Sequence, residues 1–204
     1  MRSLKPAHPG RNAQQVTSGA AVSSFTWTAD DQMILEQQNV VNLFHPDTGS
    51  KTSLTSPQQD GVAFHPVVCA NGRFVVASIL FRGGTKTITV WRMDTGGGNF
   101  KQITDGPDDE HAVCSPDGQW VYYLNRTNFR LTRVPLDGGK PERLSERPDY
   151  GAVAISPDGK LAAFAATGNG KKELALVPVD SPRNAKLVEF QRTSAVVWGG
   201  PLHA

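Results

Sequence analysis

Two histidines are the residues of this sequence best placed to form a binding site. His65 and His111 each lie seven residues before the last residue of a recurring turn, so they occupy equivalent positions in successive repeats. Paired imidazoles are able to hold a metal ion or an anion. A zinc site usually needs three or four protein ligands, however, and the other repeats carry Ser24 and Ala152 at this position. We therefore predict no metal and no cofactor, and we keep His65 and His111 as candidates at the mouth of a central channel.

A short acidic stretch is the second candidate for a site. Its carboxylates are the oxygen ligands that a hard cation prefers. Their spacing differs from that of a calcium-binding loop, so we expect a solvated loop between two repeats. The four residues are Asp105, Asp108, Asp109 and Glu110.

Motifs for catalysis are missing from the sequence. No Gly-x-Ser-x-Gly nucleophile elbow occurs in it. Residues 168–172 read Gly-Asn-Gly-Lys-Lys, which lacks the leading glycine spacing and the Ser or Thr of a phosphate loop. We predict no catalytic residue and a protein that is not an enzyme.

The two cysteines stand near turns in successive repeats, but one position apart. Cys69 aligns with Ser115, whereas Cys114 aligns with Val68. Neighbouring residues of a strand point to opposite faces of its sheet. We therefore expect two buried thiols rather than a disulfide.

Basic and aromatic residues recur along the repeats. Arg126, Arg130 and Arg133 gather in and after one turn, and Arg82 and Arg92 lie in the preceding repeat. They suggest a patch for an acidic partner or, because Arg130 and Arg133 flank Leu131 along one strand, outward-facing side chains. The four tryptophans recur at strand positions, where we expect packing between repeats rather than a ligand cage. They are Trp27, Trp91, Trp120 and Trp198.

Composition narrows the classes of partner. The 204 residues carry a net charge of +2 and contain no long run of Lys or Arg, so we predict no binding to nucleic acid. The most apolar run, residues 74–81, has the length of a strand, so we predict no membrane insertion by this segment. The amino terminus lacks an apolar signal core. The compartment stays open: cytoplasmic for a complete chain, periplasmic for a piece of an exported or membrane-anchored protein.

A turn sequence repeats along the chain. Ser-Pro-Asp-Gly at residues 115–118 and 156–159 suits a type I turn between antiparallel strands, and altered copies stand at residues 28–31 and 69–72. The last residues of the four turns are separated by 41, 46 and 41 residues, which is the period of a four-stranded propeller blade. Asp-Gly or a similar pair follows in each repeat and indicates a second hairpin.

We therefore predict an all-β fold, a β-propeller of four-stranded antiparallel blades with little or no helix. Four full blades and a partial blade at each end form one domain over residues 1–204. We expect part of a larger propeller; a ring closed by a shared blade and an open arc are the alternatives. The predicted blades are residues 20–59, 60–107, 108–148 and 149–190, with the tail of a preceding blade at 1–19 and the first strand of a following blade at 191–204.

The repeat resembles the TolB-like, WD40-like β-propeller repeat of bacteria. The third unit carries the resemblance best, through Ser-Pro-Asp-Gly, an apolar strand, Asn125-Arg126, Asp137-Gly138-Gly139 and Arg143-Leu144-Ser145. The first two units depart from the pattern at their turns. The resemblance implies small sheets arranged around a central channel.

Proteins of this kind serve as binding platforms, as sensor-like regions of membrane kinases, or as propellers that gate a prolyl-oligopeptidase-type hydrolase. From this resemblance we predict a non-enzymatic module for protein–protein interaction or scaffolding, with a protein as its partner. One alternative is a sensor or gating propeller of a larger bacterial enzyme. Another is a propeller with a small-molecule or metal site at the channel mouth.

Overall fold

The structure is a computed structural model, and it describes residues 15–56, 61–70, 72–81, 87–145, 149–168, 171–181 and 186–189. Within these ranges the chain is all-β and contains no helix, as the sequence predicts. The ends predicted to belong to partial blades lie mostly outside the described residues, and Arg82 and Trp198 lie wholly outside them. None of the described elements is a helix long and apolar enough to cross a bilayer.

In the described part of the chain sixteen strands form four antiparallel sheets, each with its strands in sequence order. Blade 1 contains β1 (Val22–Trp27), β2 (Met33–Gln37), β3 (Val40–Phe44) and β4 (Lys51–Ser53). Blade 2 contains β5 (Val62–Cys69), β6 (Phe74–Leu80), β7 (Ile88–Asp94) and β8 (Lys101–Gln102). Blade 3 contains β9 (Asp109–Cys114), β10 (Trp120–Asn125), β11 (Arg130–Pro135) and β12 (Glu142–Arg143). Blade 4 contains β13 (Asp149–Ile155), β14 (Leu161–Gly168), β15 (Lys171–Pro178) and β16 (Lys186–Glu189).

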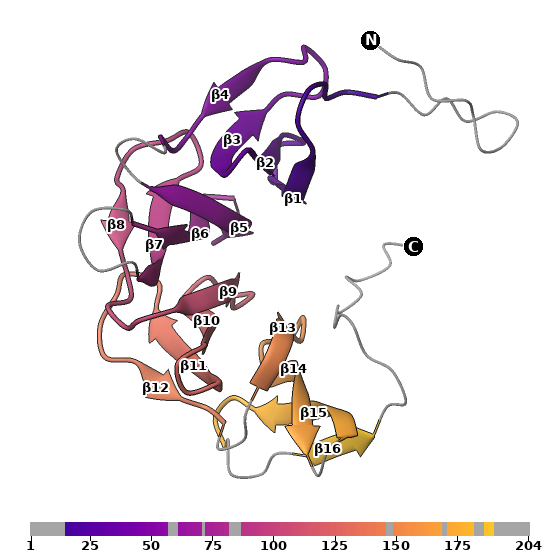
Figure 1. Ribbon diagram of the computed structural model, residues 1–204, viewed down its shortest axis with the longest axis vertical. Coiled ribbons are helices and arrows are strands. Elements are labelled where there is room, and N and C mark those ends of the chain that lie inside the picture. The colour runs from indigo at the N-terminus through magenta and orange to yellow at the C-terminus, as the bar shows by residue number, and fades with distance from the viewer. Residues whose placement is uncertain are drawn as a thin grey trace, which may run out of the picture.

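The blades follow one another around an arc (Figure 1). The first strand of each blade lies on the inner side of this arc and the fourth strand on the outer side. Along the inner side β5 contacts both β1 and β9, and β9 contacts β13. This radial order of small antiparallel sheets confirms the predicted propeller architecture.

Blades are held together by residues that alternate along each strand. In β6, Val75, Ala77 and Ile79 pack toward blade 1 with Ile34 and Val41. The intervening residues of the same strand pack the other way, against blade 3. The pattern arises because successive side chains of a strand point to opposite faces of its sheet. Blades 2 and 3 therefore each bury one face against the preceding blade and the other face against the next.

In each blade a turn, called here the A–B turn, joins the first and second strands. We call the side of the molecule that carries these turns the turn face. In blade 3 the Ser115 hydroxyl bonds the Asp117 carboxylate, and the backbone N–H of Gln119 donates to the same carboxylate at 3.0 Å. The backbone N–H of Trp120 donates to the Ser115 hydroxyl at 2.9 Å. The same three bonds recur in blade 4 around Ser156 and Asp158. These bonds lower the pKa of both aspartates, with the serine hydroxyl as the largest cause.

Candidate functional site

His65 and His111 lie at equivalent irregularities of the inner strands β5 and β9. The register of β5 against β6 shifts between Phe64 and Val67, and that of β9 against β10 shifts across the same position of the next blade. Both histidines have positive φ, 52° for His65 and 54° for His111. Such β-bulges redirect a side chain out of the regular alternation. Here the two bulges bring together imidazoles that are 46 residues apart in the chain.

The two imidazole rings stack across the boundary between blades 2 and 3. Their centroids are 4.5 Å apart and their planes differ by 27°. A metal ion shared by two histidines lies in the plane of both rings, about 2.0–2.1 Å from each nitrogen. Nearly parallel planes at this separation do not converge on one such point. Nor does any cluster of three metal-ligating side chains occur among the described residues. The geometry does not fit a shared metal ion, and the role of the pair as a site stays a prediction.

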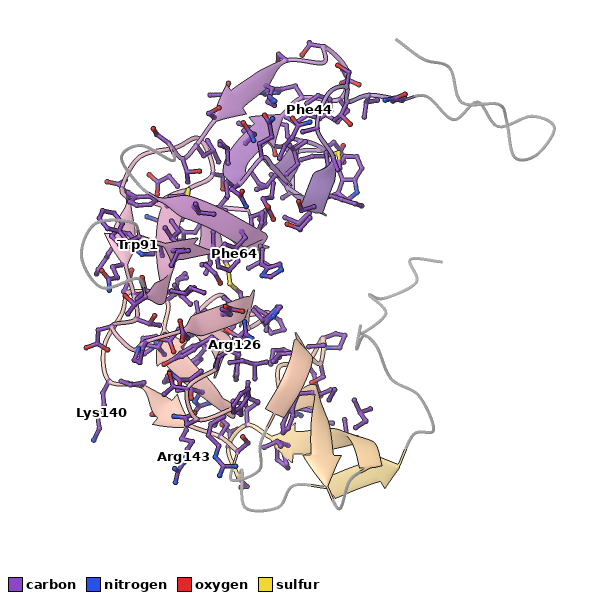
Figure 2. All side chains as sticks on the ribbon, viewed as in Figure 1. Phe44, Phe64, Trp91, Arg126, Lys140 and Arg143 are labelled. Atoms are coloured by element: carbon purple, nitrogen blue, oxygen red, sulfur yellow. A yellow bond between two sulfur atoms is a disulfide. The ribbon has the colours of Figure 1, made fainter. Side chains whose placement is uncertain are left out.

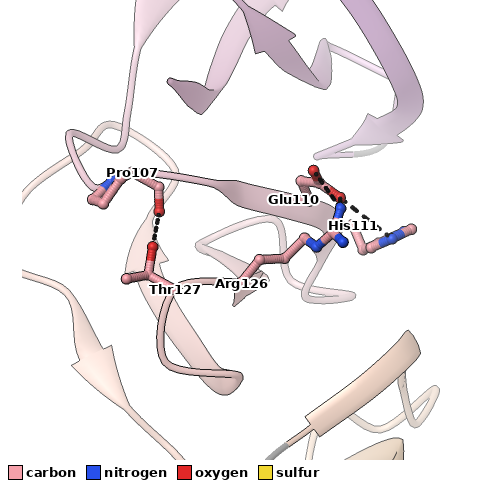
Figure 3. Close-up of polar contacts among 5 residues, drawn as sticks. All are labelled: Pro107, Glu110, His111, Arg126 and Thr127. Atoms are coloured by element: carbon pink, nitrogen blue, oxygen red, sulfur yellow. Dashed lines mark hydrogen bonds and ion pairs between the residues drawn. The ribbon is translucent and has the colours of Figure 1, made fainter. Parts of the chain in front are cut away.

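Glu110 links His111 to the next turn of the blade (Figure 3). Its carboxylate lies 3.7 Å from His111 Nε2 and 3.3 Å from Arg126 Nη1. Arg126 belongs to the turn between β10 and β11, and Thr127 of that turn donates its hydroxyl proton to the Pro107 carbonyl oxygen at 3.2 Å. These contacts fasten the strand that carries His111 to its own blade.

Burial and nearby charge lower the pKa of His111. Burial is the largest cause that lowers the pKa of His111, and the charge of His65 lowers it further, while Glu110 acts in the opposite direction. The Nδ1 atom of His65 is also buried and has no hydrogen-bond partner in the described part of the chain.

Only part of the acidic stretch is the solvated loop that we predicted, because Asp105 and Asp108 lie in the loop before β9 but Asp109 and Glu110 do not. Asp109 and Glu110 belong to β9 and are only 1% and 5% exposed. Burial raises the pKa of Asp109, and the Asn125 side chain donates a hydrogen bond to its carboxylate at 2.7 Å. The prediction was wrong for Asp109 and Glu110, because β9 begins two residues earlier than its apolar pattern suggests. Both side chains are buried in this strand.

Cys69 and Cys114 form a disulfide, with their Cα atoms 5.6 Å apart (Figure 2). The prediction of two thiols was therefore wrong. Its premise was correct, because the two cysteines do lie on opposite faces of their strands. In a propeller, however, one face of a blade meets the opposite face of the next blade. Residues on opposite faces of β5 and β9 therefore face each other, and the disulfide ties blade 2 to blade 3.

The turn face carries an open pocket where three A–B turns converge. Its volume is about 380 Å³. Residues 27–29 of blade 1, 68–70 and 72 of blade 2, and 114–116 of blade 3 line it. Trp27 is 57% exposed, so it does not provide the packing between blades that we predicted for it. Sequence reasoning missed this pocket because its lining comes mostly from turns that are far apart in the sequence.

Arg133 on the third strand of blade 3 is placed differently from our prediction. Arg133 is not outward-facing, because its side chain is 14% exposed and lies over the Trp120 ring at 4.2 Å.

Trp120 in turn packs against the core between blades 3 and 4. Trp91 stacks on Phe100 at 4.7 Å between ring centroids. Trp91 also packs against the core between blades 1 and 2, so both tryptophans contribute to packing between blades, as predicted.

The fold is that of known β-propellers. The chain superposes on the structure of a putative TolB from Agrobacterium tumefaciens with a TM-score of 0.73, at 16% identity over 90% of this chain and 66% of that one. For TolB from Acinetobacter baumannii the TM-score is 0.67, at 19% identity over 88% of this chain and 46% of that one. Regucalcin from Agrobacterium tumefaciens, described as a calcium-binding protein, gives 0.65 at 18% identity, over 94% of this chain and 68% of that one.

These similarities confirm a TolB-like propeller at the level of fold. The chain spans 66% and 46% of the lengths of the two TolB structures. No protein-family model matches the sequence, and no curated protein is similar to it in sequence. Function therefore has to be argued from the residues of the chain itself, since one fold hosts many functions.

Proposed function

We propose that this chain is a non-enzymatic β-propeller module that binds a partner protein on its turn face. The observation that carries the proposal is the pocket formed by three consecutive A–B turns. Loops held on a rigid scaffold are the usual place for binding residues. Here the hydrogen bonds within the turns and the disulfide beneath them fix the shape of the surface before any partner arrives.

The residues around this pocket suit a protein partner. Trp27 offers a large, exposed aromatic surface, and Pro116 is exposed beside it. Tryptophan is enriched among the residues that contribute most to protein interfaces. The apolar side chains and backbone groups of the turns provide both contact area and hydrogen-bonding groups for an extended segment of a partner.

The chemistry of the described residues supports a role without catalysis. Both cysteines are consumed by the disulfide, so neither is a free nucleophile. His111 contacts His65 and Glu110, and neither of these is a hydroxyl or thiol that a histidine would activate. TolB-like propellers resemble this chain in fold, and the resemblance of the repeat implies a binding platform.

Site-specific photocrosslinking tests this proposal. A photoreactive residue at Gln119 lies on the turn face, and the same residue at Asn128 lies at the opposite end of β10 as a control. In an extract of the source organism we expect one dominant protein to crosslink at Gln119 and not at Asn128. Trp27→Ala should weaken that crosslink without changing the thermal melt. Equal crosslinking at both ends, or a crosslink indifferent to Trp27→Ala, would contradict the proposal.

A further inference from the structure

A second pocket on the turn face side of blade 2 is rich in cations and aromatic rings. Its volume is about 530 Å³. Arg73, Arg92 and Lys101 contribute three positive charges to its lining, and Phe74 and Phe100 contribute apolar surface. Arg73 directly follows Gly72, which lines the pocket of the turn face. The two pockets are therefore neighbours, and the second one lies where β6 begins, β7 ends and β8 begins.

Arg92 is the central residue of this basic pocket. Its guanidinium carbon lies 4.3 Å from the centroid of the Phe74 ring, and that of Arg73 lies 4.8 Å from the same centroid. Arg92 Nη1 donates to Asp137 of blade 3 at 2.7 Å. Its Nε atom is buried and, among the residues that the structure describes, has no hydrogen-bond partner. A buried charged donor without an acceptor is costly.

The equivalent position in blade 3 shows which group pairs with the Nε atom of such an arginine. Arg133 occupies the equivalent position, since it lies over the aromatic ring of Trp120 as Arg92 lies over Phe74. In blade 3, however, Arg133 Nε donates to the Glu142 carboxylate at 2.8 Å. The register pairs Arg133 with Glu142 and Arg92 with Lys101. Blade 2 therefore carries an ammonium group where blade 3 carries the carboxylate that accepts from Nε.

The charged groups around Arg92 provide no acceptor for its Nε–H. Two cations directly opposite each other on adjacent strands destabilise a sheet. Lys101 turns away to the backbone carbonyl of Asp137, which accepts from its ammonium group at 2.7 Å. Asp94 also lines the pocket, but its carboxylate accepts from the Asn99 side chain at 2.6 Å. Neither group is bonded to Arg92 Nε.

We propose that the basic pocket of blade 2 binds the carboxylate of an acidic side chain on a partner protein. The incoming carboxylate accepts from Arg92 Nε as Glu142 accepts from Arg133 Nε, and Arg73 and Lys101 supply further charge. The proposal rests on the proposed function, because the pocket adjoins the turn face. It specifies the partner as one with an acidic segment beside the residues that contact the A–B turns.

Nuclear magnetic resonance of the arginine side chains tests the pocket directly. The full chain, labelled with ¹⁵N-arginine, is titrated with acetyl-Gly-Glu-Gly-Glu-Gly-amide, with the same peptide carrying Gln for Glu, and with inorganic phosphate. The Nε–H signal of Arg92, assigned by its loss in Arg92→Lys, should shift saturably with the Glu peptide. The signal of Arg133 should stay, because its Nε–H is already bonded to Glu142.

Two reciprocal variants exchange the charged residues that are paired with Arg92 in blade 2 and with Arg133 in blade 3. Lys101→Glu supplies an internal carboxylate and should weaken binding of the Glu peptide roughly tenfold or more, since a charge-assisted hydrogen bond is lost. Glu142→Lys should make the Arg133 signal respond as Arg92 does. An Arg92 signal that ignores the Glu peptide, or responds equally to the Gln peptide or to phosphate, overturns the proposal. Because no partner protein is used, such a failure is separate from the crosslinking result at Gln119.

Discussion

Replacement of Gly118 by alanine tests how closely the blades approach at the turn face. Gly118 has φ of +69°, and a Cβ atom there would lie 2.6 Å from Ala70 Cα and 2.7 Å from Ala70 Cβ of the preceding blade. A left-handed conformation costs a residue with a Cβ roughly 1–2 kcal/mol. Forcing extra atoms into a packed contact costs about 1–3 kcal/mol more. Gly118→Ala should therefore lower the free energy of unfolding by about 2–5 kcal/mol.

Gly159→Ala is the matched control. Gly159 ends the same Ser-Pro-Asp-Gly turn with φ of +72°, but its Cβ would meet only Pro116 Cδ, at 3.6 Å. This variant should therefore lose only the conformational part, about 1–2 kcal/mol. Urea denaturation measures both values, and an unchanged m-value shows that the midpoints report stability. Equal losses in the two variants would refute the argument that Gly118 sets the spacing between blades 2 and 3.

Three further predictions concern the disulfide and two buried titratable groups. Reduction of Cys69–Cys114, or its replacement by two serines, should lower the free energy of unfolding by about 4 kcal/mol, from the loop entropy of a 45-residue separation; thermal melts with and without dithiothreitol measure it. Because the pKa of His111 is lowered from 6.5, its neutral form stabilises the folded state fully above that pH, and this stabilisation is lost as the pH falls below it. His111→Gln should therefore flatten the dependence of the urea midpoint on pH. The pKa of Asp109 is raised, so Asp109→Asn should stabilise the protein at neutral pH, and calorimetry should find the gain shrinking as the pH falls through the pKa of the folded state.

The turns made most of the fold predictable from the sequence. A four-residue signal with a physical basis, repeated at the period of a blade, was enough to predict a propeller of four-stranded antiparallel blades. Such turns depend on local geometry, which a sequence displays directly. The runs that follow the two Ser-Pro-Asp-Gly turns form β10 and β14, as predicted for turns between antiparallel strands.

Contacts between blades were less predictable, because they depend on which faces meet. The alignment correctly placed Cys69 and Cys114 on opposite faces, and only the arrangement of the blades converts that into a disulfide. The same holds for Arg133, whose alternation along its strand suggested exposure although blade 4 covers that face. The stacking of His65 on His111 depends on two β-bulges, and no residue type in the sequence predicts them.

The disulfide also affects how the molecule opens. In an array where each unit contacts only its neighbours, local stability is set largely by the boundaries between adjacent units. The covalent link between β5 and β9 joins blades 2 and 3 into one cooperative block. Amide hydrogens of these two blades should therefore exchange together, while the boundaries on either side of the block open independently. Reduction would divide the block and convert three exchanging units into four.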